Sequence, residues 1–468
     1  MENDKNVSNR PTNPRRRKRT KEQIIKEDYL PLIIAGLAVI MIFIFIIGSI
    51  TRGIQRAIVN KNNKTQESIA ASIAKEELDA QVDFLLKQAE TLAMGFDYEG
   101  AISTLEGFTG TSADYPIIDQ KIQQYKTSLS EMIVWEDVSK IPNLSFQQLI
   151  ADPSRAFKHE KYGSSLNMNF ITIDEFSEII QQLYDNNYIL ISLDDITDGV
   201  KPISLKLPKE KKPVILTQTQ VNFYTYLTDS NKDYLPDAGG AGFASKLIVD
   251  ANGNLACEMV TASGETVTGA YDAVPILEAF IQTHPDFSYK GARAILAVTG
   301  YDGLFGYRTT GDAEIRMTVD EYQKEVDGAT EITKALRDAG YEIACYTYEN
   351  AAYGSYTIDK LEFDLEQWNV EVSPILGVVK TLVFARNSDI ATSDTVYTGE
   401  KFDMLCQYGF THYLGFAKGT PWIDTQANYF RQGRILLTGS NLAYKADWFS
   451  GILNPSAILD PSRGTIPS

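Results

Sequence analysis

A polar stretch follows one of the most apolar runs of the chain, in the sequence KKPVILTQTQV at Lys211–Val221. The apolar run predicts a buried strand, and Gln218, Thr219 and Gln220 come at its carboxyl end, where an α/β barrel presents its functional groups. Amides and hydroxyls form hydrogen bonds, but none of them is an acid, a base or a thiol near neutral pH. Groups that transfer protons must therefore come from elsewhere in the chain.

Two aspartates that follow predicted strands are the alternatives for acid–base chemistry. Asp302 lies in TGYDGLFGYR and Asp389 in ARNSDI, and two carboxylates can act as acid and base without a metal. An aspartate in a Gly-Tyr-Asp-Gly turn more often serves the turn itself. The three histidines have other expected roles: His159 in solvent, His284 at a turn and His412 within a strand.

Aromatic side chains cluster at the predicted strand ends and loops, and their faces can stack on sugar rings. The candidates for glycan binding are Tyr224, Tyr301, Tyr348 and Trp422. Arg308 can hold an acidic sugar or pair with Asp302. A chain with 25 tyrosines places several of them on any rim by chance, so the alternatives stay open.

Helix-then-strand units follow Pro142. Thr172–Asn187 and Thr318–Gly340 predict helices that begin at a threonine cap, and each precedes an apolar strand. Strands that are apolar throughout and alternate with helices indicate a parallel sheet covered on both faces. Residues 143–468 therefore predict an irregular α/β barrel of the (β/α) type, with a β-hairpin insertion at about 242–272. A doubly wound open sheet is the runner-up, but the chain lacks its Gly-rich turn.

The phrases HPDFSYKGA and TGYDGLFGYRT and the strands KKPVILTQTQV, YEIACYTYEN and KTLVFARNSDI have a specific order and spacing. Through them the chain resembles the polysaccharide deacetylases, the NodB-homology carbohydrate esterases, in a membrane-anchored branch of Gram-positive bacteria. The resemblance implies a barrel that hydrolyses acetyl groups on a glycan with a divalent metal such as zinc. In that family an Asp-Asp motif supplies the general base and a metal ligand, and H-x-x-x-H supplies two imidazole ligands.

The chain departs from the family's pattern at each of these positions. The resemblance places Thr219 at the base, Gln220 at the metal carboxylate, and Tyr346 and Asn350 at the two histidines. Two amides and a phenol are weak zinc ligands, and a threonine is no base near neutral pH. We therefore expect no cofactor and a site that was inherited and then lost its chemistry.

The first 66 residues predict a membrane anchor. Leu30–Thr51 (30–51) carries no charge and is long enough to span a membrane, and a cleaved signal peptide would have a shorter apolar run. The basic cluster Arg15–Arg19 outweighs the positive charge that follows the span, which predicts a cytoplasmic tail at 1–29 and an extracytoplasmic remainder. Residues 52–66 predict a polar linker.

Residues 67–135 predict a helical stalk that is interrupted at Gly95 and Asp97. Its second half, FDYEGAISTLEGF, resembles one helix pair of a tetratricopeptide-type repeat. Such a pair cannot bury its own apolar face and needs neighbours. A plain stalk and a module that binds a protein partner both remain open.

The distribution of net charge indicates which classes of partner the protein can bind. Residues 1–28 hold nine basic and five acidic side chains, whereas the chain from residue 29 onward has a net charge of −21. This part of the chain is therefore too acidic to bind nucleic acid well. We expect a catalytically silent, membrane-anchored protein that binds cell-envelope polysaccharide or peptidoglycan. The alternatives are an atypical deacetylase or hydrolase, and an envelope scaffold that acts through its stalk.

Overall fold

The computed structural model describes residues 63–111 and 113–467, and the chain divides into the units Met1–Gln81 and Val82–Ser468. The predicted cytoplasmic tail and membrane helix lie outside the described residues. Within the described ranges, no helix is both long and apolar enough to cross a membrane. Apart from the first part of one helix, every feature described below belongs to the larger unit.

Three helices come first along the described chain: α3 (Asn63–Met94), α4 (Tyr98–Glu106) and α5 (Pro116–Ser130). The helix break at Gly95 and Asp97 occurs as predicted, because the Asp97 side chain caps α4 by accepting from the Gly100 amide. The structure adds a third helix, α5, to the two predicted. A small apolar cluster that includes Ala89 and Leu105 lies between them.

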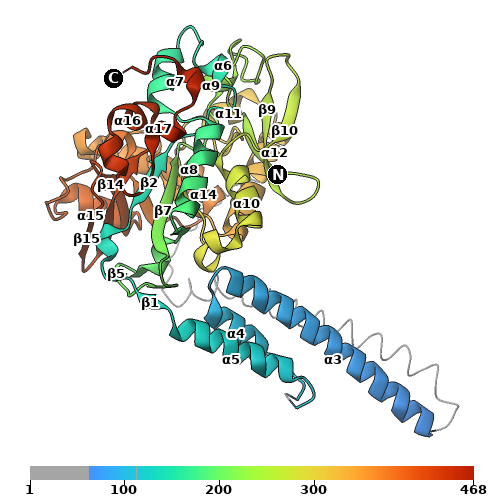
Figure 1. The fold of residues 1–468 in the computed structure, drawn as a ribbon. Coiled ribbons are helices and arrows are strands. Elements are labelled where there is room, and N and C mark those ends of the chain that lie inside the picture. Colours follow the sequence, from blue (N-terminus) through green and yellow to red (C-terminus); the bar gives the residue numbers. More distant parts are fainter. Residues whose placement is uncertain (1–62, 112, 468) are drawn as a thin grey trace, which may run out of the picture. The chain divides into compact units, whose positions relative to one another are not determined.

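Seven parallel strands close into a barrel: β2 (Asn143–Phe146), β7 (Lys212–Thr219), β11 (Ile295–Val298), β12 (Glu342–Cys345), β13 (Thr381–Val383), β14 (His412–Phe416) and β16 (Tyr429–Leu436). Closure occurs at β7, which pairs with both β2 and β11. Figure 1 shows β2 and β7 side by side. β3 (Tyr188–Leu190) pairs with the start of β7, and β15 (Ile423–Gln426) runs antiparallel to β16. The prediction of a (β/α) barrel is confirmed, and the open doubly wound sheet is wrong.

The two predicted helices are α8 (Ile173–Asp185) and α12 (Val319–Ala339). Each begins with a capping box, formed by Thr172 with Glu175 in α8 and by Thr318 with Glu321 in α12. Gly340 ends α12 in the left-handed conformation that favours glycine. The other helices that pack on the barrel include α10 (Ala273–Thr283), α13 (Ile358–Gln367) and α15 (Glu400–Gln407).

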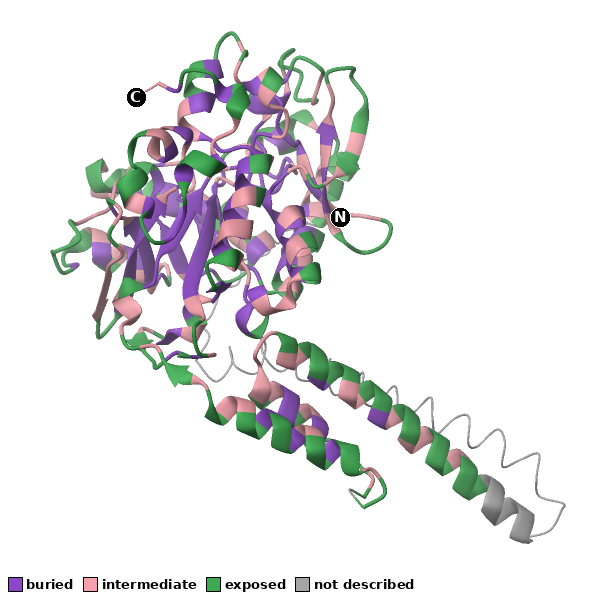
Figure 2. Ribbon diagram, in the orientation of Figure 1, coloured by how far each residue is buried: buried purple, intermediate pink, exposed green. Residues whose placement is uncertain are grey.

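Alternate residues of each barrel strand point outward or into the barrel. Outward residues such as Leu216 and Leu296 join the covering helices in the largest apolar cluster. Inward residues such as Ile215 and Ala297 form a separate cluster inside the barrel. Figure 2 shows the strands as buried over most of their length. Most of the strands are therefore apolar on both faces, which explains why they were found from sequence.

Sequence-based prediction misses two barrel strands, β2 and β16. Both carry polar residues on their inward face: Asn143 accepts from Thr217 Oγ1 at 2.7 Å and donates to Gln432 at 3.0 Å. Arg434 donates to Ser145 Oγ at 3.0 Å. Because other strands supply the hydrogen-bond partners, these groups can be buried. A search for apolar runs overlooks such strands.

The insertion forms a three-stranded antiparallel sheet of β8 (Lys246–Val249), β9 (Leu255–Val260) and β10 (Thr266–Gly269). The predicted turns at Asn252-Gly253 and Ser263-Gly264 occur as expected. Two turns connect three strands, so the insertion is a meander rather than the single hairpin predicted.

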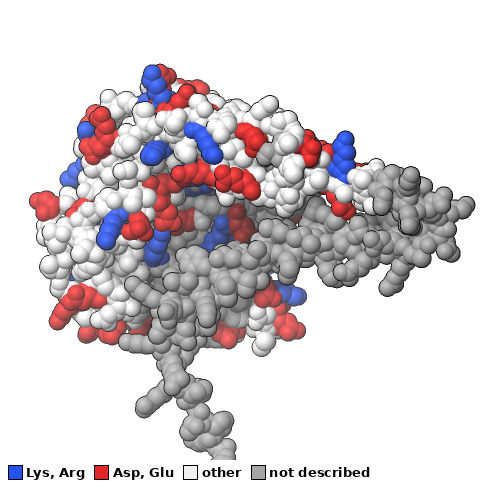
Figure 3. Space-filling view, turned by 90° about the horizontal axis from the view of Figure 1, so that it is seen from below, with Lys and Arg blue, Asp and Glu red and all other residues white. Residues whose placement is uncertain are grey.

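Charged side chains of both signs share the described surface. On the face shown in Figure 3, acidic side chains are interleaved with lysine and arginine. Nucleic acid binds best to a continuous basic surface, which the visible described residues of this face do not form. The absence of a nucleic-acid partner stays a prediction.

Asp272 gives the barrel an expected pH dependence. Its carboxylate is buried and accepts from Leu149 N and from Gln218 Nε2, and burial raises its pKa to about 6. The folded protein therefore holds this proton more tightly than the unfolded chain. The group favours folding at low pH, and that contribution is lost as the pH rises from about 4 through about 6. The shift corresponds to about 3 kcal/mol.

We expect Asp272→Asn to remove this decline in stability. The variant can keep its contacts because Gln218 Oε1 has no partner and can turn to accept from the new amide. Urea unfolding of both proteins at about pH 4.5 and about pH 6.5 measures the difference. The same loss of stability in both proteins would contradict the assignment to Asp272.

Candidate functional site

A cavity of about 230 Å³ opens at the carboxyl end of the barrel. Parallel barrels hold their functional groups at this end. Its lining comes from the ends of β2, β7 and β16 and from the segments that follow β12 and β13. The lining residues are Ser145, Phe146, Gln147, Asn169, Thr219, Gln220, Tyr346, Asn350, Arg386, Asn387, Arg434, Leu436, Leu437 and Thr438.

The structure brings together the four positions that the resemblance assigned to the base and the metal ligands. Thr219 ends β7 and Gln220 follows it, while Tyr346 and Asn350 follow β12, and all four line this one cavity. The two segments are separated by more than 120 residues of chain, so their meeting results from the closure of the barrel.

Backbone strain is concentrated around the cavity. Gln220, Asn350, Arg386 and Asn387 have φ values of 59, 54, 54 and 54°, in the left-handed region that non-glycine residues seldom adopt. Each of them follows the end of a barrel strand. Strained residues persist only where the surrounding fold enforces them, and they cluster at functional sites.

Hydrogen bonds hold part of the lining in place and leave part of it open. Thr219 Oγ1 donates to Phe146 O at 3.2 Å, and Gln220 Nε2 donates to Gln147 Oε1 at 3.0 Å. Asn350 Oδ1 and Arg434 Nε are buried without a hydrogen-bond partner. Orphaned polar atoms of this kind mark places where a ligand can complete the bonding.

These residues do not fit a divalent metal. Zinc prefers thiolate, imidazole and carboxylate ligands, whereas the lining offers amides, hydroxyls and two guanidinium groups. Arginine donates hydrogen bonds and repels a cation. Elsewhere in the described part of the chain, no group of three or more His, Cys, Asp and Glu is arranged to hold a metal.

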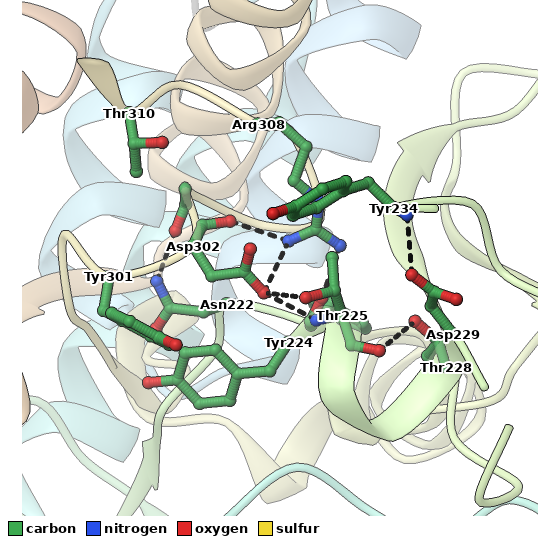
Figure 4. Close-up of polar contacts among 12 residues, drawn as sticks. Asn222, Tyr224, Thr225, Thr228, Asp229, Tyr234, Tyr301, Asp302, Arg308 and Thr310 are labelled. Atoms are coloured by element: carbon green, nitrogen blue, oxygen red, sulfur yellow. Dashed lines mark hydrogen bonds and ion pairs between the residues drawn. The ribbon is translucent and has the colours of Figure 1, made fainter. Parts of the chain in front are cut away.

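Asp302 and Arg308 lie outside the cavity lining and bind each other (Figure 4). Asp302 Oδ2 accepts from Thr225 N at 2.6 Å and lies 3.4 Å from Arg308 Nη1. Arg308 also donates to the Asp302 carbonyl and to Phe223 O. Of the two roles considered for Arg308, the structure shows the pairing with Asp302.

Asp389 and Trp422 also lie outside the cavity lining, around a buried arginine of β16. Arg431 Nη2 donates to Asp389 Oδ2 at 3.0 Å, and Tyr397 donates to the other oxygen of this carboxylate. Trp422 packs against Gly433 and lies near the Arg431 guanidinium. Asp389 is thus engaged by an arginine and a tyrosine.

Four tyrosines form a row, which we call the tyrosine row, in the order Tyr162, Tyr226, Tyr224 and Tyr301. Successive ring centroids are 5.5, 5.6 and 5.9 Å apart. Tyr224 is buried, whereas Tyr226 and Tyr301 are 43% and 58% exposed. Burial raises the pKa of Tyr224. None of the four tyrosines is among the residues that line the cavity.

Tyr348, the remaining glycan candidate, is half-buried. Its hydroxyl donates to Glu371 Oε2 at 2.5 Å, and its ring covers Gly300, where a β-carbon would lie 2.0 Å from the ring. Its hydroxyl is therefore already bonded within the chain.

The histidines lie apart from the cavity. His412 is buried in β14 as expected, and burial lowers its pKa to about 4. His284 ends α10 and stacks on Phe280, and His159 stacks on Tyr162.

Sequence reasoning missed Arg386 and Arg434, the two basic residues that line the cavity. Arg386 follows β13 directly, and Arg434 lies on a strand that was not predicted. The usable signal for Arg386 is its position directly after a predicted strand, and Arg434 has no such signal.

No family model matches the chain, and no curated protein matches it. Among solved structures the chain is similar to the Streptococcus pyogenes deacetylase PplD in complex with acetate, at 12% identity and a TM-score of 0.35. The match covers 69% of this chain and 99% of that one. At this distance it assigns neither a fold nor an activity to the chain.

Proposed function

We propose that the protein is a polysaccharide-deacetylase-like glycan-binding protein that does not hydrolyse its ligand. The observation that carries the proposal is the lining of the barrel cavity. Thr219, Gln220, Tyr346 and Asn350 gather there, and these are the four residues that the resemblance assigns to the base and the three metal ligands. Their side chains can form hydrogen bonds with a sugar, but they cannot deprotonate water near neutral pH.

The tyrosine row supports a glycan as the ligand. Tyr226 and Tyr301 present exposed rings, and aromatic faces pack well against the apolar faces of sugar rings. A sugar that rests on these rings can extend a polar substituent toward the cavity. In this proposal the protein acts outside the cell, on envelope polysaccharide or peptidoglycan, and is anchored by the membrane helix predicted at 30–51.

A test with two arms uses the full chain in detergent micelles. After equilibration with zinc and desalting, we expect no stoichiometric zinc and no acetate release from acetylated wall glycan. In the second arm we expect the chain to sediment with insoluble wall glycan, and Tyr301→Ala to weaken this binding by about tenfold. The matched control is Phe363→Ala, because Phe363 is a similarly exposed aromatic on α13.

One tightly held zinc ion per chain, or acetate release, would overturn the non-hydrolytic proposal and favour the atypical deacetylase. Asp302→Asn and Asp389→Asn would then show whether either aspartate acts in it. Equal sedimentation of the Tyr301 and Phe363 variants would show that the tyrosine row does not contribute to glycan binding.

A further inference from the structure

One buried arginine lacks the counter-charge that the others have. Among the described residues, four arginines are buried. The paired ones are Arg308 with Asp302, Arg431 with Asp389 and Arg463 with Glu175. Arg434 is only 1% exposed, and no carboxylate of the described residues lies within ion-pair distance of it. A buried charge without a partner is strongly unfavourable, so this exception calls for an explanation.

Arg434 is also incompletely hydrogen-bonded. Its Nη1 donates to Ser145 Oγ at 3.0 Å and its Nη2 to Phe384 O at 3.2 Å, while Nε has no partner. A guanidinium group carries five N–H bonds, so three of them remain uncommitted. Burial also lowers the pKa of Arg434, and the opposing effects of Tyr346 and Asp389 offset this only in part.

The cavity that Arg434 lines has the electrostatics of an anion site. Arg386 supplies a second guanidinium group, and no aspartate or glutamate is among the lining residues. The positive cavity lies in a chain whose net charge is −17. Local positive charge in an acidic protein selects anions at that one place.

We propose that the cavity binds an oxyanion, a carboxylate or phosphate group carried by the glycan, with buried Arg434 and exposed Arg386 as its counter-charges. Arginine forms strong, charge-assisted hydrogen bonds with both groups. The inference rests on the proposed function and narrows it to acidic glycans: the sugar ring lies on the tyrosine row, and its anionic substituent enters the cavity. The oxyanion then completes the hydrogen bonding that the chain leaves open at Arg434.

The test compares matched probes on the full chain by calorimetric titration. N-acetylglucosamine is neutral, N-acetylmuramic acid is the same sugar with a carboxylate, and N-acetylglucosamine 6-phosphate carries a phosphate. Lactate and inorganic phosphate are the corresponding anions without a sugar. The variants are Arg434→Gln, Arg386→Gln on the exposed side, and the charge-matched control Lys324→Gln on α12, which does not line the cavity.

We expect one acidic sugar to bind at least about tenfold more tightly than N-acetylglucosamine. Arg434→Gln and Arg386→Gln remove this preference, and Lys324→Gln keeps it. The stronger of the two acidic sugars identifies the group as carboxylate or phosphate. Equal binding of all three sugars, unchanged in both cavity variants, would overturn the oxyanion site and leave glycan binding in place. Binding of lactate or phosphate that needs Arg434, without added affinity from any sugar, would support the oxyanion site and overturn the glycan function.

Discussion

Replacement of Glu175 by alanine should destabilise the protein by about 3–5 kcal/mol, the usual cost of removing one partner of a buried ion pair. Glu175 and Arg463 are both buried, and the two carboxylate oxygens accept from Arg463 Nε and Nη2. The same carboxylate closes the capping box of α8 on Thr172 and accepts from the Asp460 amide. The variant leaves a buried guanidinium group without a counter-charge. Urea unfolding followed by circular dichroism measures the loss.

The matched control is Glu321→Ala. Glu321 closes an equivalent capping box with Thr318 at the start of α12, but it is exposed and has no arginine partner. We expect its loss to cost about 1 kcal/mol or less, as for a helix cap alone. Equal destabilisation by the two substitutions would mean that the Arg463 pair contributes nothing measurable.

The second large effect is expected at Gly303, in the turn that joins Asp302 to Arg308. Gly303 has a φ of +91°, and a β-carbon there would lie 2.0 Å from the Tyr307 carbonyl oxygen and 2.9 Å from Thr309 N. Both contacts are with backbone atoms, which cannot rotate away. We expect Gly303→Ala to cost about 1–2 kcal/mol from the left-handed conformation and about 1–3 kcal/mol more from overpacking.

Gly253→Ala separates these two contributions. Gly253 has a similar φ of +83°, but nothing lies within 4 Å of its β-carbon position. The control therefore carries the conformational cost without the clash, and the difference between the two urea midpoints isolates the clash. If the two variants lose the same stability, the clash at Gly303 costs nothing measurable, and the turn must relax to avoid it.

Local signals were sufficient for α8 and α12 and for most of the barrel strands. The capping boxes at Thr172 and Thr318 and the left-handed glycine at Gly340 depend on residues a few positions apart, so they are visible in the sequence. β7 is apolar and buried from Pro213 to Leu216, and it was predicted. β2 and β16 were not, because Asn143 and Arg434 are accommodated by partners on distant strands, which no local pattern records.

Some residues of the candidate site could be located from the sequence, and others could not. The resemblance located Thr219, Gln220, Tyr346 and Asn350, and closure of the barrel brings these four residues into one cavity. Their function as an emptied site stays a prediction. Arg434 could not be predicted from the sequence. It stands out because it is buried without a carboxylate partner, and that can be seen only in the folded structure.

The pairing of β16 with β2 has a further consequence. It joins the last barrel strand to the first, and the bond from Arg434 to Ser145 spans 289 positions of the chain. A ligand held by Arg434 and by the residues after β7 and β12 would therefore contact strands that lie far apart in the sequence. Its binding free energy would therefore add to the stability of the folded barrel, because the ligand binds only when these strands are assembled.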